Sequence, residues 1–170
     1  IGPEIRARRE RGADRGDILG SLLEATDAEG NSLDDMQVLD HVLTLLFAGH
    51  DTTTSTVTFF SYELACNPAW FPSLRNEIGE VLAGEAAGAE QLFGGLPLLT
   101  QAIDETLRLY PPAWVGPRRV VRDFRFAGID VPAGLPISYS SWVSHRLPDV
   151  WDEPTRFRPE RFAPEARAAL

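Results

Sequence analysis

The chain has 170 residues, 44% hydrophobic and 24% charged, which suits one globular domain and excludes a disordered tail. Its 16 basic and 25 acidic residues give a net charge of −9, which argues against nucleic acid as a partner, because phosphate binding needs a basic face. The single cysteine, Cys66, excludes an internal disulfide and a multi-thiolate metal site, so we expect a soluble, cytoplasmic protein.

The sequence starts at Ile1, and its only methionine is Met36. We therefore expect an internal piece of a longer protein, whose own N-terminus, with or without a membrane anchor, lies outside this sequence.

Helices are predicted for the first two thirds of the chain. A charged helix and linker (1–17) is followed by a short helix capped by Asp17 and by a turn (27–32). The pattern Ser32–Asp35 has the form of a capping box and predicts a long helix that runs to about Ala65. Two more helices (73–82 and 98–110) flank a loop (83–95), and Pro111 and Pro112 end the second of them.

Short strands are predicted after this double proline. Residues 119–121, 124–126, 129–131 and 135–141 are short runs separated by glycine and proline, which is typical of a small antiparallel sheet. The tail from 148 to 164 is rich in turns, and we expect it to be irregular but packed. The predicted fold class is mainly α with a minor antiparallel β part.

One stretch of the long helix is unusually polar. Residues 48–56 combine Gly49 and Asp51 with a run of threonines, and all of these are weak helix formers. Their hydroxyls can bond to the backbone one turn earlier, so we predict a local distortion of the helix at a functional site. The alternative is a solvated helix face with satisfied hydroxyls.

A second candidate is an acid and a base that share one helix face. Glu105 and Arg108 are three residues apart just before Tyr110, and the default interpretation is an ordinary surface pair. If Arg108 is buried, however, every donor needs a partner, and Arg161 is a candidate member of the cluster.

Three ordered segments together resemble the cytochrome P450 monooxygenases. They are Ala48–Thr53 (AGHDTT), Glu105–Arg108 (ETLR) and Phe157–Phe162 (FRPERF). The resemblance covers about residues 32–162 and implies a partial cytochrome P450 fold, with 1–170 as one partial domain. It also implies a haem whose iron is held by a cysteine thiolate and activates O₂.

The resemblance assigns roles to individual residues. Asp51 and Thr52 would be catalytic, with Thr52 bonding to dioxygen and holding a water, and Asp51 in the proton route. The cofactor contacts would be Ala48, Gly49, Thr52 and Arg118, the last pairing with a haem propionate and Arg119 as its substitute. Glu105, Arg108 and Arg161 would form a structural charge cluster. Ala113, Trp114 and Val115 would line the substrate site, with core packing as an equal alternative.

The family's haem-ligating cysteine follows the last motif, and this sequence ends before such a loop. We therefore expect the haem ligand to lie outside this chain, the fragment alone to be inactive, and Cys66 to be a small buried residue. The implied partners are an apolar small-molecule substrate, O₂, and a redox partner such as a ferredoxin or a flavoprotein reductase.

Two other functions were considered. His50 and Asp51 are also typical of metal-dependent hydrolases, with His41 as a second ligand, but nine residues place the two rings on different parts of the helix. We therefore predict no metal ligands among the side chains, and expect His50 to pack near the substrate or to bond to backbone. The last alternative is a non-catalytic helical interaction domain.

Overall fold

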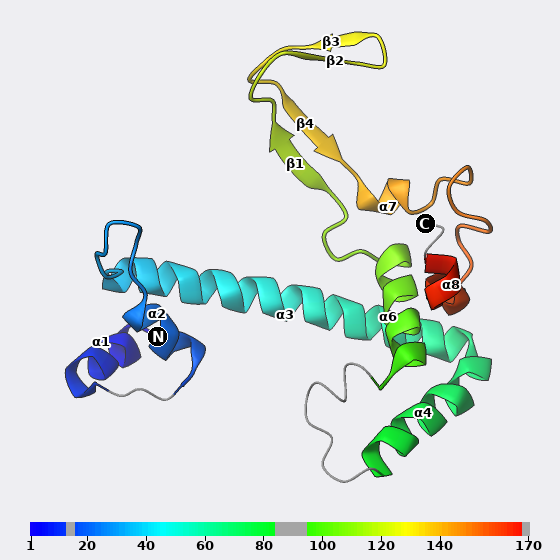
Figure 1. Ribbon diagram of the computed structural model, residues 1–170, viewed down its shortest axis with the longest axis horizontal. Coiled ribbons are helices and arrows are strands. Elements are labelled where there is room, and N and C mark those ends of the chain that lie inside the picture. Colours follow the sequence, from blue (N-terminus) through cyan, green and yellow to red (C-terminus); the bar gives the residue numbers. More distant parts are fainter. Residues whose placement is uncertain (13–15, 84–94, 168–170) are drawn as a thin grey trace. The chain divides into compact units, whose positions relative to one another are not determined.

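The computed structural model describes residues 1–12, 16–83 and 95–167 (Figure 1). The chain divides into two compact units, Ile1–Thr53 and Thr54–Leu170, which are described separately. The fold is mainly helical with small antiparallel strand pairs, which confirms the predicted fold class.

The first unit contains α1 (Gly2–Arg11), α2 (Ile18–Glu24) and the first part of α3 (Asp35–Cys66). Ile5 and Val38 are its fully buried apolar side chains among the described residues. Asp17 caps α2 as predicted, because its carboxylate accepts the Gly20 N–H at 2.9 Å. The same carboxylate pairs with Arg8 of α1 at 2.6 Å, so one acid joins the two helices.

The long helix starts later than the sequence pattern predicts. The capping box is formed by Asp34 and Gln37, not by Ser32 and Asp35. Asp34 accepts the Gln37 N–H at 2.8 Å, and the Gln37 side chain accepts the Asp34 N–H at 2.9 Å. Ser32 instead forms an isolated antiparallel bridge with Thr26, because Asp27 and Asn31 close a turn between them. The expected end of the helix near Ala65 agrees with the observed end at Cys66.

The second unit packs the last part of α3 with α4 (Phe71–Ala83) and α6 (Pro97–Leu109). A short 3₁₀ helix, η1 (Pro68–Trp70), turns the chain from α3 into α4. The core of this unit is formed by Leu74, Ala102, Leu109 and Phe157. The loop predicted between the last two helices falls mostly on residues 84–94, which lie outside the described residues.

The strands form two separate antiparallel pairs and not one sheet. β1 (Gly116–Arg119) pairs with β4 (Pro136–Tyr139), and β2 (Phe124–Phe126) pairs with β3 (Ile129–Val131). The β2–β3 hairpin turns at Ala127 and Gly128, whose φ angles of 48° and 82° match the type of turn that suits the twist of a hairpin. The first strand is predicted at 119–121, but β1 ends at Arg119; Val120 still bonds to the backbone of Gly134 and Leu135, and Val121 is 92% exposed.

The tail folds back onto α6, as the prediction of a packed, irregular segment requires. It contains α7 (Ser141–Ser144), η2 (Pro159–Phe162) and α8 (Pro164–Arg167). Phe157 and Pro159 are buried, and Arg167 pairs with Asp104 of α6 at 3.0 Å. α6 thus packs against α4, α7 and η2, whereas the two strand pairs extend away from it (Figure 1).

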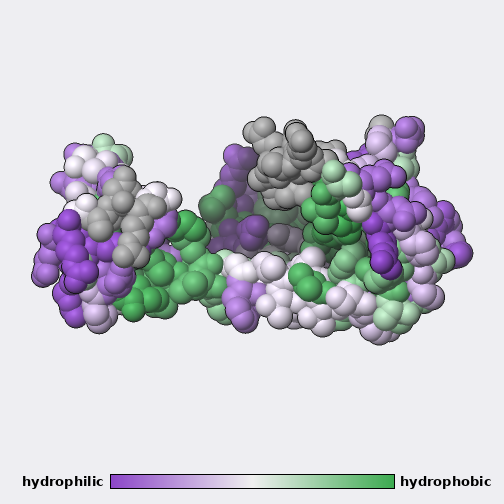
Figure 2. All heavy atoms as spheres, turned by 90° about the horizontal axis from the view of Figure 1, so that it is seen from below, coloured by the Kyte–Doolittle hydropathy of each residue, from purple (hydrophilic) through white to green (hydrophobic). Residues whose placement is uncertain are grey.

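Large apolar side chains are exposed on both units, as the hydrophobic surface in Figure 2 shows. They include Phe47 on α3, Trp114 after α6 and Phe126 on β2. Within the described residues, no helix combines the length and the hydropathy that crossing a membrane requires.

Candidate functional site

The polar stretch of α3 is an unbroken α-helix, so the predicted distortion is wrong. Residues 48–56 all have helical hydrogen bonding within α3. The Thr52 hydroxyl donates to the Ala48 carbonyl at 2.6 Å, and Thr58 and Ser61 bond in the same way further along the helix. A carbonyl oxygen has two lone pairs, so it can accept a hydroxyl while it keeps its helical N–H bond. The hydroxyls are therefore accommodated without a break in the helix.

Asp51 and His50 contact each other on the surface of the first unit. His50 Nδ1 lies 3.0 Å from Asp51 Oδ1, and the two side chains are 77% and 63% exposed. His50 thus bonds to a carboxylate; of its two expected arrangements, the bond to backbone is not the contact observed here, and packing near the substrate stays a prediction. Ala48, Gly49 and Thr52 are exposed as well, and a Cβ added to Gly49 would have no neighbouring atom within 4 Å. The stretch thus presents an acid and a hydroxyl beside an open, small-residue surface.

The second unit brings Glu105 and Arg108 together in a buried pair. Their side chains are 0% and 2% exposed, and the guanidinium meets the carboxylate through two bonds, Nε–Oε2 at 2.6 Å and Nη2–Oε1 at 2.9 Å. This two-point geometry is the strong form of an arginine–carboxylate interaction. It is the opposite of the ordinary surface pair that an isolated E-x-x-R pattern indicates by default.

Every remaining donor of Arg108 finds a backbone carbonyl. Nη1 donates to the oxygens of His145 and Pro154, both at 2.7 Å, and Nη2 also reaches that of Arg156 at 3.4 Å. The Trp151 ring lies over the guanidinium, 5.0 Å from its carbon. Burial of this charge is tolerated because no donor is left unsatisfied.

Arg161 joins the same carboxylate from η2. Its Nε lies 3.4 Å from Glu105 Oε1, and its Nη2 donates to the Glu153 carbonyl at 2.9 Å. Glu105 Oε1 also accepts the backbone N–H of Arg158 at 2.8 Å. The three predicted cluster residues therefore meet at Glu105 and fasten the tail to α6.

Arg118 and Arg119 are both exposed on β1. Arg118 donates to the Pro117 carbonyl at 2.8 Å and lies over the Tyr139 ring at 5.3 Å. Arg119 donates to the Gly134 carbonyl at 3.0 Å. Arg118 thus bonds within its own strand and contacts a ring of β4, whereas Arg119 bonds to the loop before β4.

Ala113, Trp114 and Val115 are exposed, so they do not pack into the core of this chain. Trp114 is 59% exposed, and its carbonyl accepts the Ser140 hydroxyl at 3.1 Å. Cys66, expected to be buried, is exposed at the end of α3. The Cys66 thiol raises the pKa of Tyr62 through a side-chain hydrogen bond.

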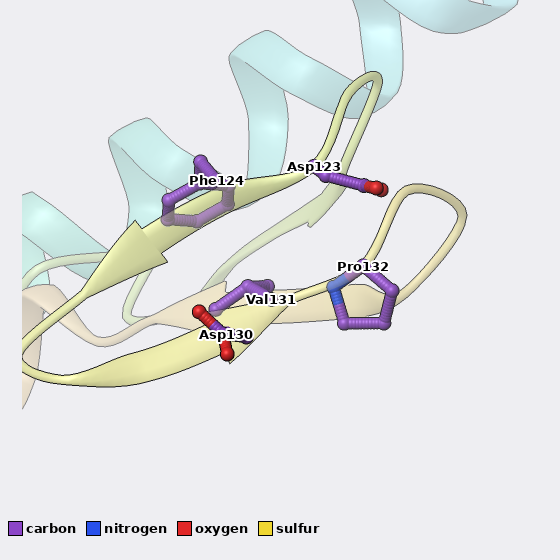
Figure 3. Close-up of a pocket in the computed structure, with 5 residues that line it drawn as sticks. All are labelled: Asp123, Phe124, Asp130, Val131 and Pro132. Atoms are coloured by element: carbon purple, nitrogen blue, oxygen red, sulfur yellow. The ribbon is translucent and has the colours of Figure 1, made fainter.

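A pocket of about 540 Å³ lies beside the β2–β3 hairpin (Figure 3). It is lined by Asp123, Phe124, Asp130, Val131 and Pro132. Asp123 already accepts the Ala133 N–H at 2.7 Å, and Asp130 is 3.5 Å from Arg125, so both carboxylates serve the hairpin itself. Within the three described ranges, no three metal-ligating side chains gather at one point.

Sequence reasoning missed a polar network between α3 and the end of α6. Glu63 is 6% exposed and accepts the Tyr110 hydroxyl at 2.8 Å and the Asn67 amide at 2.9 Å. The available signal was a glutamate in the largely apolar run Phe59–Cys66. The partner could not be inferred, since 47 residues separate Glu63 from Tyr110.

The long helix α3 and the buried E-x-x-R pair fixed to a following P-E-R-F segment have the order that the sequence shares with the cytochrome P450 family. The family model for cytochrome P450 matches residues 4–169, and the chain belongs to this family. It is 42% identical over 159 residues to cyclooctat-9-en-7-ol 5-monooxygenase of Streptomyces melanosporofaciens, covering 93% of this chain and 34% of that protein. It is 33% identical over 154 residues to cytokinin hydroxylase of Arabidopsis thaliana, covering 90% of this chain and 30% of that protein.

A solved structure, retinoic acid-bound cyanobacterial CYP120A1, matches with a TM-score of 0.91 and 35% identity, over 98% of this chain and 38% of that one. The chain thus spans about a third of the length of the relatives it matches. The hydrolase and interaction-domain alternatives are not favoured by these relatives.

Proposed function

We propose that the protein containing this chain inserts one atom of O₂ into an apolar organic substrate, using haem and electrons from a redox partner, and that residues 1–170 form part of one cytochrome P450 domain. The observation that carries this proposal is the exposed Ala48–Thr52 surface, where an acid and a hydroxyl lie beside two small residues. The family supports the general reaction, because cytochromes P450 are haem monooxygenases.

Each unit, taken by itself, presents residues that would suit part of a haem. Gly49 has no neighbour within 4 Å of an added Cβ, so a flat group can approach the backbone there, against Ala48 and Thr52. Arg118 is exposed and suited to pair with a propionate, because its planar guanidinium meets a carboxylate at two points. When bound, haem supplies the activation of O₂.

The iron ligand is not found among the residues that fit. Cys66 is the only cysteine of the sequence, and it lies in neither the Ala48–Thr52 surface nor the strand that carries Arg118. We therefore infer that the ligating thiolate comes from a residue outside this sequence and that residues 1–170 alone are inactive.

In this proposal, Thr52 binds a water and Asp51 transfers a proton from solvent. The Thr52 Oγ1 proton now points to the Ala48 carbonyl, and rotation of the hydroxyl allows it to bond a water or a polar ligand on the open surface. Asp51 is charged and exposed, and its Oδ1 holds His50 at 3.0 Å, so it can take a proton from solvent and pass it on.

The buried cluster has a structural role in the proposal. Glu105, Arg108 and Arg161 join α6 to the tail through buried, fully paired charges, and they contain no accessible acid or base for catalysis. They would hold the framework around the haem in one arrangement.

The substrate would contact Ala113, Trp114 and Val115, which present an apolar, exposed segment. The names of two relatives mention cyclooctat-9-en-7-ol and retinoic acid, and both of these molecules are largely hydrocarbon. Electrons would come from a ferredoxin or a flavoprotein reductase.

The test is a carbon monoxide difference spectrum of the reduced full-length protein. A thiolate-ligated haem gives the red-shifted Soret band that defines the family, and the spectrum should be the same for a Cys66→Ala variant. Absence of this band from a folded, haem-loaded protein would contradict the proposal. Loss of the band in Cys66→Ala would show that the ligand had been assigned wrongly.

A further inference from the structure

We propose that the hydrogen bond between Tyr110 and Glu63 positions the Ala113–Val115 segment and thereby sets the shape of the substrate site. This inference rests on the proposed function, because it uses the substrate-lining role of that segment. Both residues lie in the second unit.

Glu63 is held in one orientation by two neighbours. Its Oε1 accepts the Tyr110 hydroxyl at 2.8 Å, and its Oε2 accepts the side-chain amide of Asn67 at 2.9 Å. Asn67 is fixed in turn, because the same amide donates to the Glu63 carbonyl at 2.9 Å. A carboxylate with both oxygens engaged is a rigid acceptor, so the position of the tyrosine hydroxyl follows from the position of α3.

The Tyr110 ring is fixed by packing as well. Phe59 of α3 stacks on it at 4.2 Å with the planes 1° apart, and Tyr62 meets its edge at 6.3 Å. The guanidinium of Arg146 lies on the ring at 6.0 Å and donates to the Leu109 carbonyl. Partial burial and the neighbouring Glu63 raise the pKa of Tyr110 to about 12, so the hydroxyl remains a donor at neutral pH.

A stiff connection joins the fixed Tyr110 ring to the apolar segment Ala113–Val115. Tyr110 ends α6 and is followed at once by Pro111 and Pro112, each of which fixes its own φ and restricts the residue before it. At the other end of the segment, the Trp114 carbonyl accepts the Ser140 hydroxyl at 3.1 Å. The apolar segment Ala113–Val115 is therefore held at two points, the Tyr110–Glu63 bond before it and the Ser140–Trp114 bond within it. Glu63 fixes the first of these points.

The experiment uses the full-length, haem-loaded protein and two probes that bind haem iron through a ring nitrogen. Imidazole is small, whereas 4-phenylimidazole fills more of the space beside the haem. Their dissociation constants are measured by difference spectroscopy for the wild type, Tyr110→Phe, Glu63→Leu and the double variant. Tyr62→Phe is the matched control, because it removes a neighbouring exposed hydroxyl that bonds to Cys66 and keeps the ring that meets the edge of Tyr110.

We expect Tyr110→Phe and Glu63→Leu each to change the dissociation constant of 4-phenylimidazole at least threefold and that of imidazole less than twofold. The double variant should match the single variants, because all three lack the same bond. Tyr62→Phe should change neither constant.

A stability-only role would lower the unfolding temperature of Tyr110→Phe while both dissociation constants stayed at their wild-type values, and this result would overturn the inference. Equal shifts for the two probes, or additive effects in the double variant, would also overturn it. If Glu63→Leu does not fold, the dissociation constants of Tyr110→Phe and Tyr62→Phe for the two probes still test the inference. Failure of the wild type to bind either probe would instead contradict the proposed function.

Discussion

Two helical segments rich in polar residues behave in opposite ways. In α6, Glu105 and Arg108 are buried, and each polar atom is paired with a side chain or with the backbone of the tail. In α3, Asp51 and Thr52 are exposed, and their bonds include two local ones, to His50 and to the Ala48 carbonyl. The comparison teaches that the first segment joins α6 to the tail through buried charges, whereas the second lies on an exposed helix surface.

The largest effect should come from Arg108→Ala. This change leaves Glu105 as a buried charge without its main partner and frees the carbonyls of His145 and Pro154. We expect the free energy of unfolding to fall by about 3–5 kcal/mol. Urea unfolding of the full-length protein, followed by far-UV circular dichroism, measures it.

Arg108→Lys is the matched control for that experiment. A lysine keeps the charge but lacks the planar fork, so it should recover only part of the loss. If Arg108→Ala unfolds like the wild type, the buried cluster does not have the structural role we assign to it.

A smaller loss is expected for Arg161→Ala. Arg161 makes a longer contact with Glu105, 3.4 Å, and one bond to the Glu153 carbonyl, while Arg108 remains in place. We expect a loss of about 1–2 kcal/mol in the same urea assay. A loss as large as that of Arg108→Ala would mean that the three charges act as one indivisible unit.

The third prediction concerns alkaline pH. The folded-state pKa of Tyr110 is raised from 10 to about 12, by burial first and by Glu63 second. The neutral tyrosine therefore contributes stability that is fully present below pH 10 and is lost as the pH rises from 10 towards 12. Urea midpoints at pH 9, 10 and 11 should fall more steeply for the wild type than for Tyr110→Phe. Parallel curves for the two proteins would contradict the assignment.

The smallest effect on stability is expected for Thr52→Val. The Thr52 hydroxyl donates to the Ala48 carbonyl of its own helix on an exposed surface, and valine has nearly the same shape as threonine, so we expect a change within about 0.5 kcal/mol. Urea unfolding of Thr52→Val and Arg108→Ala in the same assay compares the two losses in the free energy of unfolding directly. A loss comparable to that of Arg161→Ala would show that Thr52 belongs to the structural framework.

Much of the fold follows from local sequence signals. The cap at Asp17, the long helix that ends near Cys66, and the end of α6 before Pro111 were all predicted, because caps, proline and periodicity act over a few residues. The start of the long helix was misplaced because Ser32 and Asp34 both suit a cap, and the turn held by Asp27 decides between them.

The details of the sites were harder to predict. The main partners of Arg108 outside α6 are backbone carbonyls 37 to 48 residues away, and a carbonyl leaves no trace in the sequence. The bond between Glu63 and Tyr110 could not be predicted either, because 47 residues separate the two side chains in the sequence. The expected break at Thr52 was wrong, because the weak helix propensity of single residues is overridden when each hydroxyl bonds within the helix.

The most direct test of the account is the yield of oxidised substrate per electron consumed by the full-length protein with its redox partner. For Thr52→Val we expect this yield to fall several-fold with a matching rise in peroxide, whereas Thr52→Ser, which keeps the hydroxyl, should remain near the wild type. Equal yields for all three proteins would show that the hydroxyl on this exposed surface takes no part in the reaction, and would contradict the account.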